Sequence, residues 1–185
     1  MPEQPSITTA RLVLRPLTLN DAADVQRLAG DFDIASTALL IPHPYEDGLA
    51  ERWLRSLPEQ WERGEAATFA ITFRKGGELL GAIGLTVCKT HARAELGYWI
   101  GKPYWGQGYC TEAAAALVDF GFTHLTLNRV FAHHFVRNPA SGRVLQKIGM
   151  RHEGCLKNHV LKWNVFEDIE VYGIVRGQWQ AARAT

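Results

Sequence analysis

Residues 95–112 have the sequence Glu95-Leu-Gly-Tyr-Trp-Ile-Gly-Lys-Pro-Tyr-Trp-Gly-Gln-Gly-Tyr-Cys-Thr-Glu112. The first half predicts a strand, the two glycines predict a loop, and the last residues predict a helix start. Gly106 and Gly108 allow close approach of a ligand to the backbone because they lack a Cβ atom. The following helix offers unpaired N–H groups and the positive end of its dipole, which favour an anion. This stretch therefore predicts either a pyrophosphate-binding loop or an ordinary structural turn.

Two common nucleotide-binding loops do not fit the sequence. A P-loop requires the run GxxxxGK[ST], which is absent. A dinucleotide-binding fingerprint requires a third glycine at position 111, and Thr111 stands there. The next predicted strand, residues 129–137, carries no carboxylate for a ribose.

The flanking patterns predict one mixed α/β domain that spans residues 8–180, after a flexible tail of residues 1–7. Alternating residues with Gly and Pro boundaries indicate seven strands, at 11–15, 67–74, 78–89, 93–101, 129–137, 150–157 and 165–175. Helical periodicity indicates helices at 18–30, 49–64, 110–122 and 140–148, with Pro58 dividing the second or kinking it. The predicted order is β-α-α-β-β-β-α-β-α-β-β.

Composition and charge exclude several protein classes. The 185 residues are 46% hydrophobic and 21% charged, as expected for a globular domain and not for a disordered chain. Residues 1–92 carry 9 basic and 12 acidic side chains, and residues 93–185 carry 11 and 7, so the net charge is +1. No nucleic acid or membrane partner is expected at that net charge. The basic residues between Arg129 and Lys157 indicate either a solvated rim or a site for a polyanionic small molecule.

Cysteine usage and the lack of apolar runs predict the compartment. The chain has three cysteines, Cys88, Cys110 and Cys155. Their number is odd and no two of them have CxxC spacing, which argues against a disulfide framework or a zinc site. We identify no signal peptide and no apolar run long enough to span a membrane. We therefore expect a cytoplasmic protein that binds no metal. The adjacent His133 and His134 cannot chelate one ion from a strand, because their side chains point to opposite faces.

Three motifs in order carry a resemblance to a known family. They are the strand and loop Glu95–Ala113, the helix Asn138-Pro-Ala-Ser141 ending in Lys147-Ile-Gly-Met150, and the strand Glu153-Gly-Cys-Leu-Lys157. This series resembles the GNAT superfamily of acetyl-CoA-dependent N-acetyltransferases. It is most similar to the RimJ/RimL-type branch, which acetylates N-terminal amines of ribosomal proteins. The resemblance implies a mixed, mostly antiparallel seven-stranded sheet with helices on both faces.

The resemblance also implies acetyl-CoA as co-substrate and a place for each part of it. Backbone groups of Trp99 and Ile100 would pair with the pantetheine arm, as would Asn138. The pyrophosphate would lie on the backbone N–H groups of Gly106, Gln107, Gly108, Tyr109, Cys110 and Thr111. Arg143 and Lys147 would contact the nucleotide phosphates, or else form a solvated helix surface.

Catalytic roles follow from the same resemblance. Many members place a tyrosine acid where this chain has Leu145, so Ser141 becomes the candidate that assists departure of the thiolate, or is simply a helix-start serine. Glu95 would remove the amine proton, or is an exposed or ion-paired strand carboxylate. Some members of the branch have a further glutamate where this chain has Val160. Cys110 is expected to be a packing residue, since the amine can attack the thioester directly.

The acceptor is predicted to be the N-terminal α-amine of a protein, with His43, Tyr45, Trp163 and Phe166 lining its side of the site. A small-molecule amine, such as an antibiotic, a polyamine or an amino acid, is the alternative. A non-catalytic acyl-CoA-binding module is a third, which would require the loss of both Glu95 and Ser141. The protein is expected to act as a monomer or a homodimer.

Overall fold

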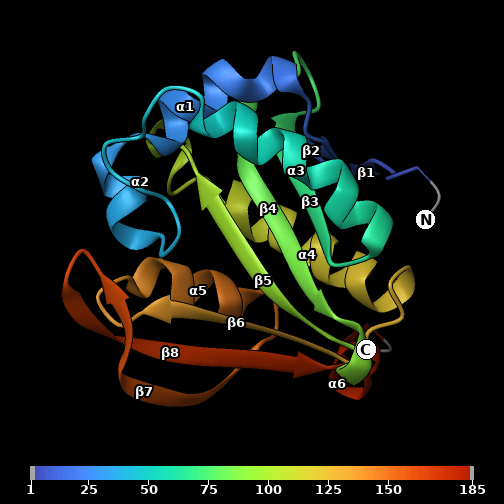
Figure 1. Ribbon diagram of the computed structural model, residues 1–185. Coiled ribbons are helices and arrows are strands. Elements are labelled where there is room, and N and C mark those ends of the chain that lie inside the picture. Colours follow the sequence, from blue (N-terminus) through green and yellow to red (C-terminus); the bar gives the residue numbers. More distant parts are fainter. Residues whose placement is uncertain (1–2, 184–185) are drawn as a thin grey trace.

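A computed structural model describes residues 3–183 and shows one eight-stranded sheet (Figure 1). The strand order is β1-β2-β3-β4-β5-β6-β8-β7, and every neighbouring pair is antiparallel except β5 and β6. The strands are β1 (Ile7–Thr8), β2 (Leu12–Pro16), β3 (Ala66–Phe73), β4 (Leu79–Cys88), β5 (Arg93–Ile100), β6 (Arg129–Phe135), β7 (Arg151–Lys162) and β8 (Val165–Val175).

Helices cover both faces of this sheet (Figure 1). The α-helices are α1 (Ala22–Ala29), α2 (Phe32–Thr37), α3 (Leu49–Arg63), α4 (Tyr109–Thr123), α5 (Pro139–Lys147) and α6 (Arg176–Arg183). Helices α1 and α3 pack together on one face, and α4 and α5 pack together on the other. The domain is therefore a mixed α/β layer structure with a single sheet at its centre.

Alternation along the strands divides the apolar side chains between two clusters. On β3, Phe69 and Ile71 join the larger cluster beneath α4, whereas Ala70 joins the smaller cluster beneath α1 and α3. Successive residues of a strand point to opposite faces, so one strand supplies both layers. All of these side chains are almost completely buried.

The sheet has one strand more than the seven predicted. Ile7 and Thr8 pair with Leu14 and Val13 as a two-residue edge strand, in a stretch too short to show alternation. Of the tail predicted at residues 1–7, residues 1 and 2 lie outside the described part of the chain. The short helix α2 and the terminal helix α6 were also not predicted. Pro58 lies within one continuous helix, α3.

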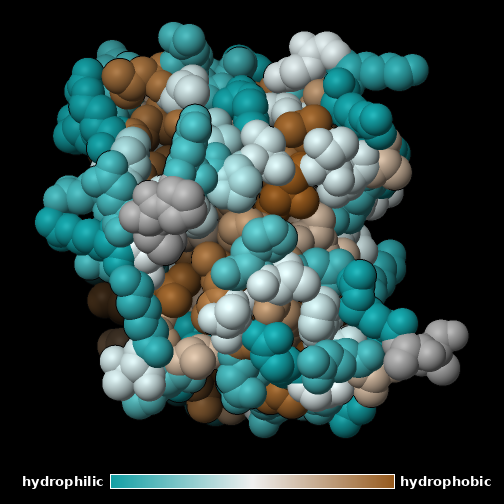
Figure 2. All heavy atoms as spheres, turned by 90° about the vertical axis from the view of Figure 1, so that its right-hand side faces the viewer, coloured by the Kyte–Doolittle hydropathy of each residue, from teal (hydrophilic) through white to brown (hydrophobic). Residues whose placement is uncertain are grey.

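The outer surface is mostly polar. Figure 2 shows the face on the right of Figure 1, where hydrophilic side chains cover most of the view and hydrophobic ones are visible in separate patches. Between residues 3 and 183, no helix has both the length and the apolar character needed to cross a membrane.

The two central strands pair over only a short distance. Strands β5 and β6 are joined at Arg93–Arg129, Ala94–Val130 and Glu95–Phe131 and then diverge. Beyond that point β5 stays paired with β4 as far as Ile100, and β6 stays paired with β8 as far as Phe135. The sheet is thus split into two halves that open like a V (Figure 1).

Candidate active site

A cavity of about 720 Å³ lies where β5 and β6 diverge. Its walls come from both strands, from α2 and the loop that follows it, and from the starts of α4 and α5. Most of the predicted site residues line it, namely Glu95, Trp99, Ile100, Gly106, Gly108, Tyr109, Cys110, Thr111, Asn138, Ser141, Arg143 and Lys147. The fold therefore brings most of the predicted catalytic and coenzyme-binding residues around one space.

The loop before α4 has the geometry of an anion site. Gly106 and Gly108 have φ values of +73° and +80°, a left-handed conformation that L side chains rarely adopt. Gly108 is the N-cap of α4, and the first helical bond runs from the N–H of Glu112 to its carbonyl (3.0 Å). The N–H groups of the first turn therefore stay available to a ligand, at the positive end of the helix dipole.

The N-terminal part of the chain braces this loop. Arg11 donates to the carbonyl of Gln107 (3.0 Å), pairs with Glu112 (2.7 Å) and lies over the ring of Tyr109 (4.5 Å). Partial burial would raise the pKa of Glu112, but hydrogen bonds from Thr9 and Arg11 lower it overall. The sequence analysis missed Arg11, because it lies about a hundred residues before its partners.

The end of β5 is tied to the same loop. The indole N–H of Trp105 donates to the carbonyl of Ile100 at 2.6 Å. This bond fixes the direction in which the chain leaves the strand and enters the glycine loop. The carbonyl of Ile100, which belongs to the backbone predicted to pair with pantetheine, therefore accepts a hydrogen bond from Trp105. The backbone groups of Trp99 lie one residue earlier on β5.

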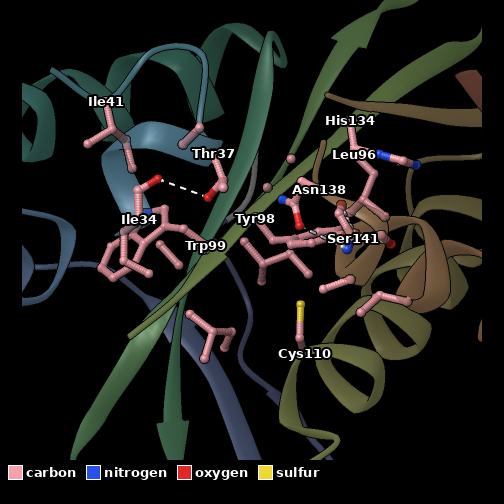
Figure 3. Close-up of a pocket in the computed structure, with 18 of the residues that line it drawn as sticks. Ile34, Thr37, Ile41, Leu96, Tyr98, Trp99, Cys110, His134, Asn138 and Ser141 are labelled. Carbon is pink, nitrogen blue, oxygen red and sulfur yellow. Dashed lines mark hydrogen bonds between the residues drawn. The ribbon is translucent and has the colours of Figure 1, made fainter. Parts of the chain in front are cut away.

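Tyr98 and Ser141 meet across the opening between β5 and α5 (Figure 3). The hydroxyl of Tyr98 lies 2.8 Å from Oγ of Ser141 and donates to its carbonyl at 3.2 Å. Asn138 caps α5, with Oδ1 accepting from the N–H of Ser141 (3.4 Å). Burial raises the pKa of Tyr98, so its hydroxyl stays protonated and can donate. The sequence analysis missed Tyr98, although it lies inside the decisive stretch.

Cys110 points its sulfur toward the same pair (Figure 3). Burial raises the pKa of its thiol to about 12. A thiol with that pKa is protonated at neutral pH, and the thiolate is the nucleophilic form. The structure therefore gives Cys110 a packing position at the start of α4 and no means of activating it.

Glu95 is paired with a histidine that the sequence analysis did not assign to the site. Its Oε1 lies 2.9 Å from Nδ1 of His133, and both residues line the cavity. The neighbouring His134 stacks instead on Tyr172, with ring centroids 5.6 Å apart. The described residues 3–183 contain no group of three His, Cys, Asp or Glu side chains placed to hold a metal ion.

The far end of the cavity is mainly apolar. Ile34 and Thr37 of α2, residues 38–41, Trp53 and Trp99 form its walls. Figure 3 shows Ile34, Thr37 and Ile41 on the opposite side of Trp99 from Ser141. We name this end the acceptor half, and the end at the glycine loop and α5 the donor half.

The four residues predicted to contact the acceptor lie outside the cavity lining. His43 and Trp163 both contact Phe32, with ring centroids 5.3 and 5.6 Å away, beside the acceptor half. Phe166 is 64% exposed on the β7–β8 hairpin. Tyr45 packs against the apolar cluster beneath α1 and α3.

The arrangement is suited to group transfer between two bound reactants. One end offers backbone N–H groups and basic side chains to an anion, and the other is an apolar chamber. The carboxylate of Glu95 lies at the last pair of β5 and β6, where the strands diverge. A hydroxyl pair, Tyr98 and Ser141, lies between them on the donor side. Burial keeps the Cys110 thiol protonated, so the arrangement suits direct transfer between two bound reactants without a thioester on the enzyme.

Comparisons with known proteins identify the family. The family described as "Acetyltransferase (GNAT) domain" matches residues 11–151, and the chain belongs to it. The uncharacterized N-acetyltransferase YnaD of Bacillus subtilis is 30% identical over 173 residues, 94% of this chain and 98% of that protein. The ribosomal protein uS5 alanine N-acetyltransferase of Escherichia coli is 27% identical over 187 residues, 96% and 94% of the two chains.

Solved structures share the fold. RimJ of Mycobacterium smegmatis, in complex with CoA-disulfide, has a TM-score of 0.84 at 23% identity, over 98% of this chain and 96% of that one. The spermidine N-acetyltransferase of Vibrio cholerae, in complex with CoA and spermine, has a TM-score of 0.80 at 21% identity, over 93% and 99%. The protein is an acyltransferase of the GNAT type, and acetyl-CoA is its co-substrate.

Replacement of Gly108 by valine tests the anion loop. We expect Gly108→Val to weaken acetyl-CoA binding by at least about tenfold, since a branched side chain at φ +80° distorts the helix start. Calorimetry measures the affinity, and the coenzyme-induced rise in Tm should shrink with it. Gly76→Val is the matched control, with φ +92° and open space around it in the β3–β4 turn. Equal coenzyme affinity in wild type and Gly108→Val would contradict the assignment.

Proposed function

We propose that this N-acetyltransferase acetylates a single primary amine, the N-terminal α-amine of a peptide or protein. The observation that carries the proposal is the charge of the cavity. Among the described residues that line it, Glu95 is the one carboxylate, and the acceptor half is apolar or neutral. One carboxylate matches one cationic amine.

The apolar walls argue against a polyamine. Each further ammonium group of a polyamine would have to leave water for a wall made of side chains such as Ile34, Trp53 and Trp99. Burial of a charge without a partner is costly, so such a ligand would need additional acids. The shared fold with a spermidine acetyltransferase does not offset this, since it concerns the fold alone.

Glu95 is suited to remove the proton of the incoming amine. An α-amine has a pKa of about 7.7–8.0, so roughly a tenth of it is already neutral at pH 7, against a few in ten thousand for a lysine amine. An α-amine therefore demands little of its base. His133, at 2.9 Å, can hold the Glu95 carboxylate in one orientation by donating from Nδ1.

Ser141 and Tyr98 are suited to stabilise the leaving thiolate through hydrogen bonds. When acetyl-CoA is bound, it supplies the thioester carbonyl that accepts the amine nitrogen. A C–N bond forms, the C–S bond breaks, and the amine proton goes to Glu95. The Oγ–H of Ser141 donates a hydrogen bond to the departing thiolate, which takes its proton from solvent. Tyr98, 2.8 Å from that oxygen, can in turn donate to it. Positioning of the reactants in the opening contributes the larger part of the rate.

Two further features fit this proposal. A relative that covers nearly the whole chain is named for acetylation of an alanine of ribosomal protein uS5. Cys88, Cys110 and Cys155 are all free thiols, which suits the reducing cytoplasm where such acceptors are made.

A comparison of acceptors tests the proposal. The acceptors to compare are peptides with a free α-amine and an uncharged first side chain, spermidine and an aminoglycoside. We expect kcat/KM to be at least about tenfold higher for the peptides, because the other two would bury additional ammonium groups without partners. Free-thiol release from acetyl-CoA measures all three classes. N-terminally blocked peptides that carry a lysine are the control. A preference for the polyamine would overturn the proposed acceptor while leaving the acetyltransferase class intact.

Removal of the Ser141 hydroxyl tests whether this group assists departure of the thiolate. Ser141→Ala should lower kcat by at most about 10²–10³-fold, because the coenzyme thiol, with a pKa of about 8.5, leaves tolerably without help. Coenzyme affinity should stay near normal. Ser56→Ala, which removes a helical serine bonded to the carbonyl of Trp53, is the control. If kcat is unchanged while chemistry limits the rate, Ser141 is only a helix-start residue.

The pH dependence of a Glu95 variant tests the base. With an α-amine acceptor, Glu95→Gln should reduce kcat/KM mainly below pH 8, since above that pH solvent has already removed the proton. With a lysine-like amine the loss should persist to about pH 10. The profiles of kcat/KM against pH for wild type and variant give the answer. A constant offset across pH 6–9 would mean that Glu95 positions the amine and does not take its proton.

A further inference from the structure

Lys162, the last residue of β7, is buried although it carries a charge. It is 5% exposed, whereas its neighbours Leu161 and Trp163 are 53% and 44% exposed. Lysines are seldom buried to this extent without partners. Burial lowers the pKa of Lys162, and the positive charge of Arg137 lowers it further. A group kept in such a position needs strong compensating contacts.

Those contacts come from three backbone carbonyls of one loop. Nζ of Lys162 donates to the carbonyls of Ala38 (2.8 Å), Leu39 (3.1 Å) and Ile41 (2.6 Å). An ammonium group has three N–H donors, so each donor has its own acceptor. Residues 38–48 form neither helix nor strand. These three carbonyls therefore take part in no hydrogen bonds of a sheet or helix that could replace those from the lysine. Ala38, Leu39 and Ile41 are half-buried, so without the lysine their carbonyls would have to take donors from water.

The loop that Lys162 holds is a wall of the acceptor half. Residues 38–41 and the adjoining residues Ile34 and Thr37 of α2 all line the cavity. A second contact joins the same parts, since Trp163 stacks on Phe32 of α2 with ring centroids 5.6 Å apart. The ammonium of Lys162 also lies 4.6 Å from the centre of the Trp163 ring. The β7–β8 hairpin therefore fixes a wall that belongs to the other half of the split sheet.

We propose that Lys162 is a positioning residue for the acceptor amine. It sets the place of residues 38–41, and thereby the width of the acceptor half, without touching either reactant. The proposal rests on the proposed function in one respect, namely that the amine enters the acceptor half of the cavity. It makes Lys162 a determinant of acceptor binding and leaves the donor half, built from the glycine loop and α5, unaffected.

The test replaces Lys162 by an uncharged side chain of similar length. Lys162→Met should raise KM for the acceptor peptide about 10–100-fold, with kcat changed less, because three carbonyls lose their donors and the wall moves. The Kd of acetyl-CoA should stay within about twofold. Lys162→Arg keeps the charge but presents a planar fork, and should restore part of the loss. Lys157→Met is the control. Lys157 lies on β7, as Lys162 does, but at the surface, where it pairs with Asp168 of β8 (2.8 Å).

Hydrogen exchange gives a readout that needs no acceptor. The backbone amides of residues 38–41 should exchange faster in Lys162→Met than in wild type or Lys157→Met. Unchanged exchange there, or an unchanged acceptor KM, would overturn the proposal. An equal loss of acetyl-CoA affinity would show a general structural role and would overturn it too. If the acceptor comparison instead selects another amine, the proposed function fails, and the KM of that amine tests Lys162 in the same way.

Discussion

The divergence of β5 and β6 after the Glu95–Phe131 pair is the constraint on which the rest of the site depends. Backbone groups that face the opening lose their partners in the sheet and must find others, in water or in an extended ligand. Helix α5 packs closely against β6 beside the opening, and this requires Gly142. A Cβ atom there would lie 2.6 Å from Nε2 of His134. The opening thus depends on a short parallel seam and on a glycine that lets a helix approach the strand.

The side chains of β5 alternate between its two faces, so neighbouring residues of this strand line different parts of the cavity. Tyr98 lies with Cys110 and Ser141 on the side of α4 and α5, while Trp99 lies with Ile34 and Ile41 (Figure 3). Under the proposed function, donor and acceptor would enter the opening from different faces of this strand. Their reacting atoms can meet at the seam without a covalent enzyme intermediate, which agrees with the high pKa of the Cys110 thiol.

Local patterns predicted the parts of the fold that local physics decides. The seven longer strands and the loop before α4 depend on alternation, Gly and Pro boundaries and helix starts that lie close in the sequence. Strand β1 has two residues and is defined only by its pairing with β2. The contacts of Tyr98 with Ser141 and of Glu95 with His133 join residues about forty positions apart, and no local pattern encodes them. Tyr45 is aromatic and near the predicted acceptor side, yet tertiary packing places it against the core.

The two halves of the cavity differ in how the chain builds them, and this has a functional consequence. The donor half comes mainly from residues 95–147, where one loop and two helix starts follow each other closely. The acceptor half is assembled from α2 and residues 38–41 and from Trp53 on α3, and the hairpin that carries Lys162 holds residues 38–41 from outside. A substitution in any of these distant segments can reshape the acceptor half without disturbing the glycine loop. Under the proposed function, acceptor choice could therefore change while the coenzyme site is kept, because the segments that build the acceptor half are separate from the glycine loop.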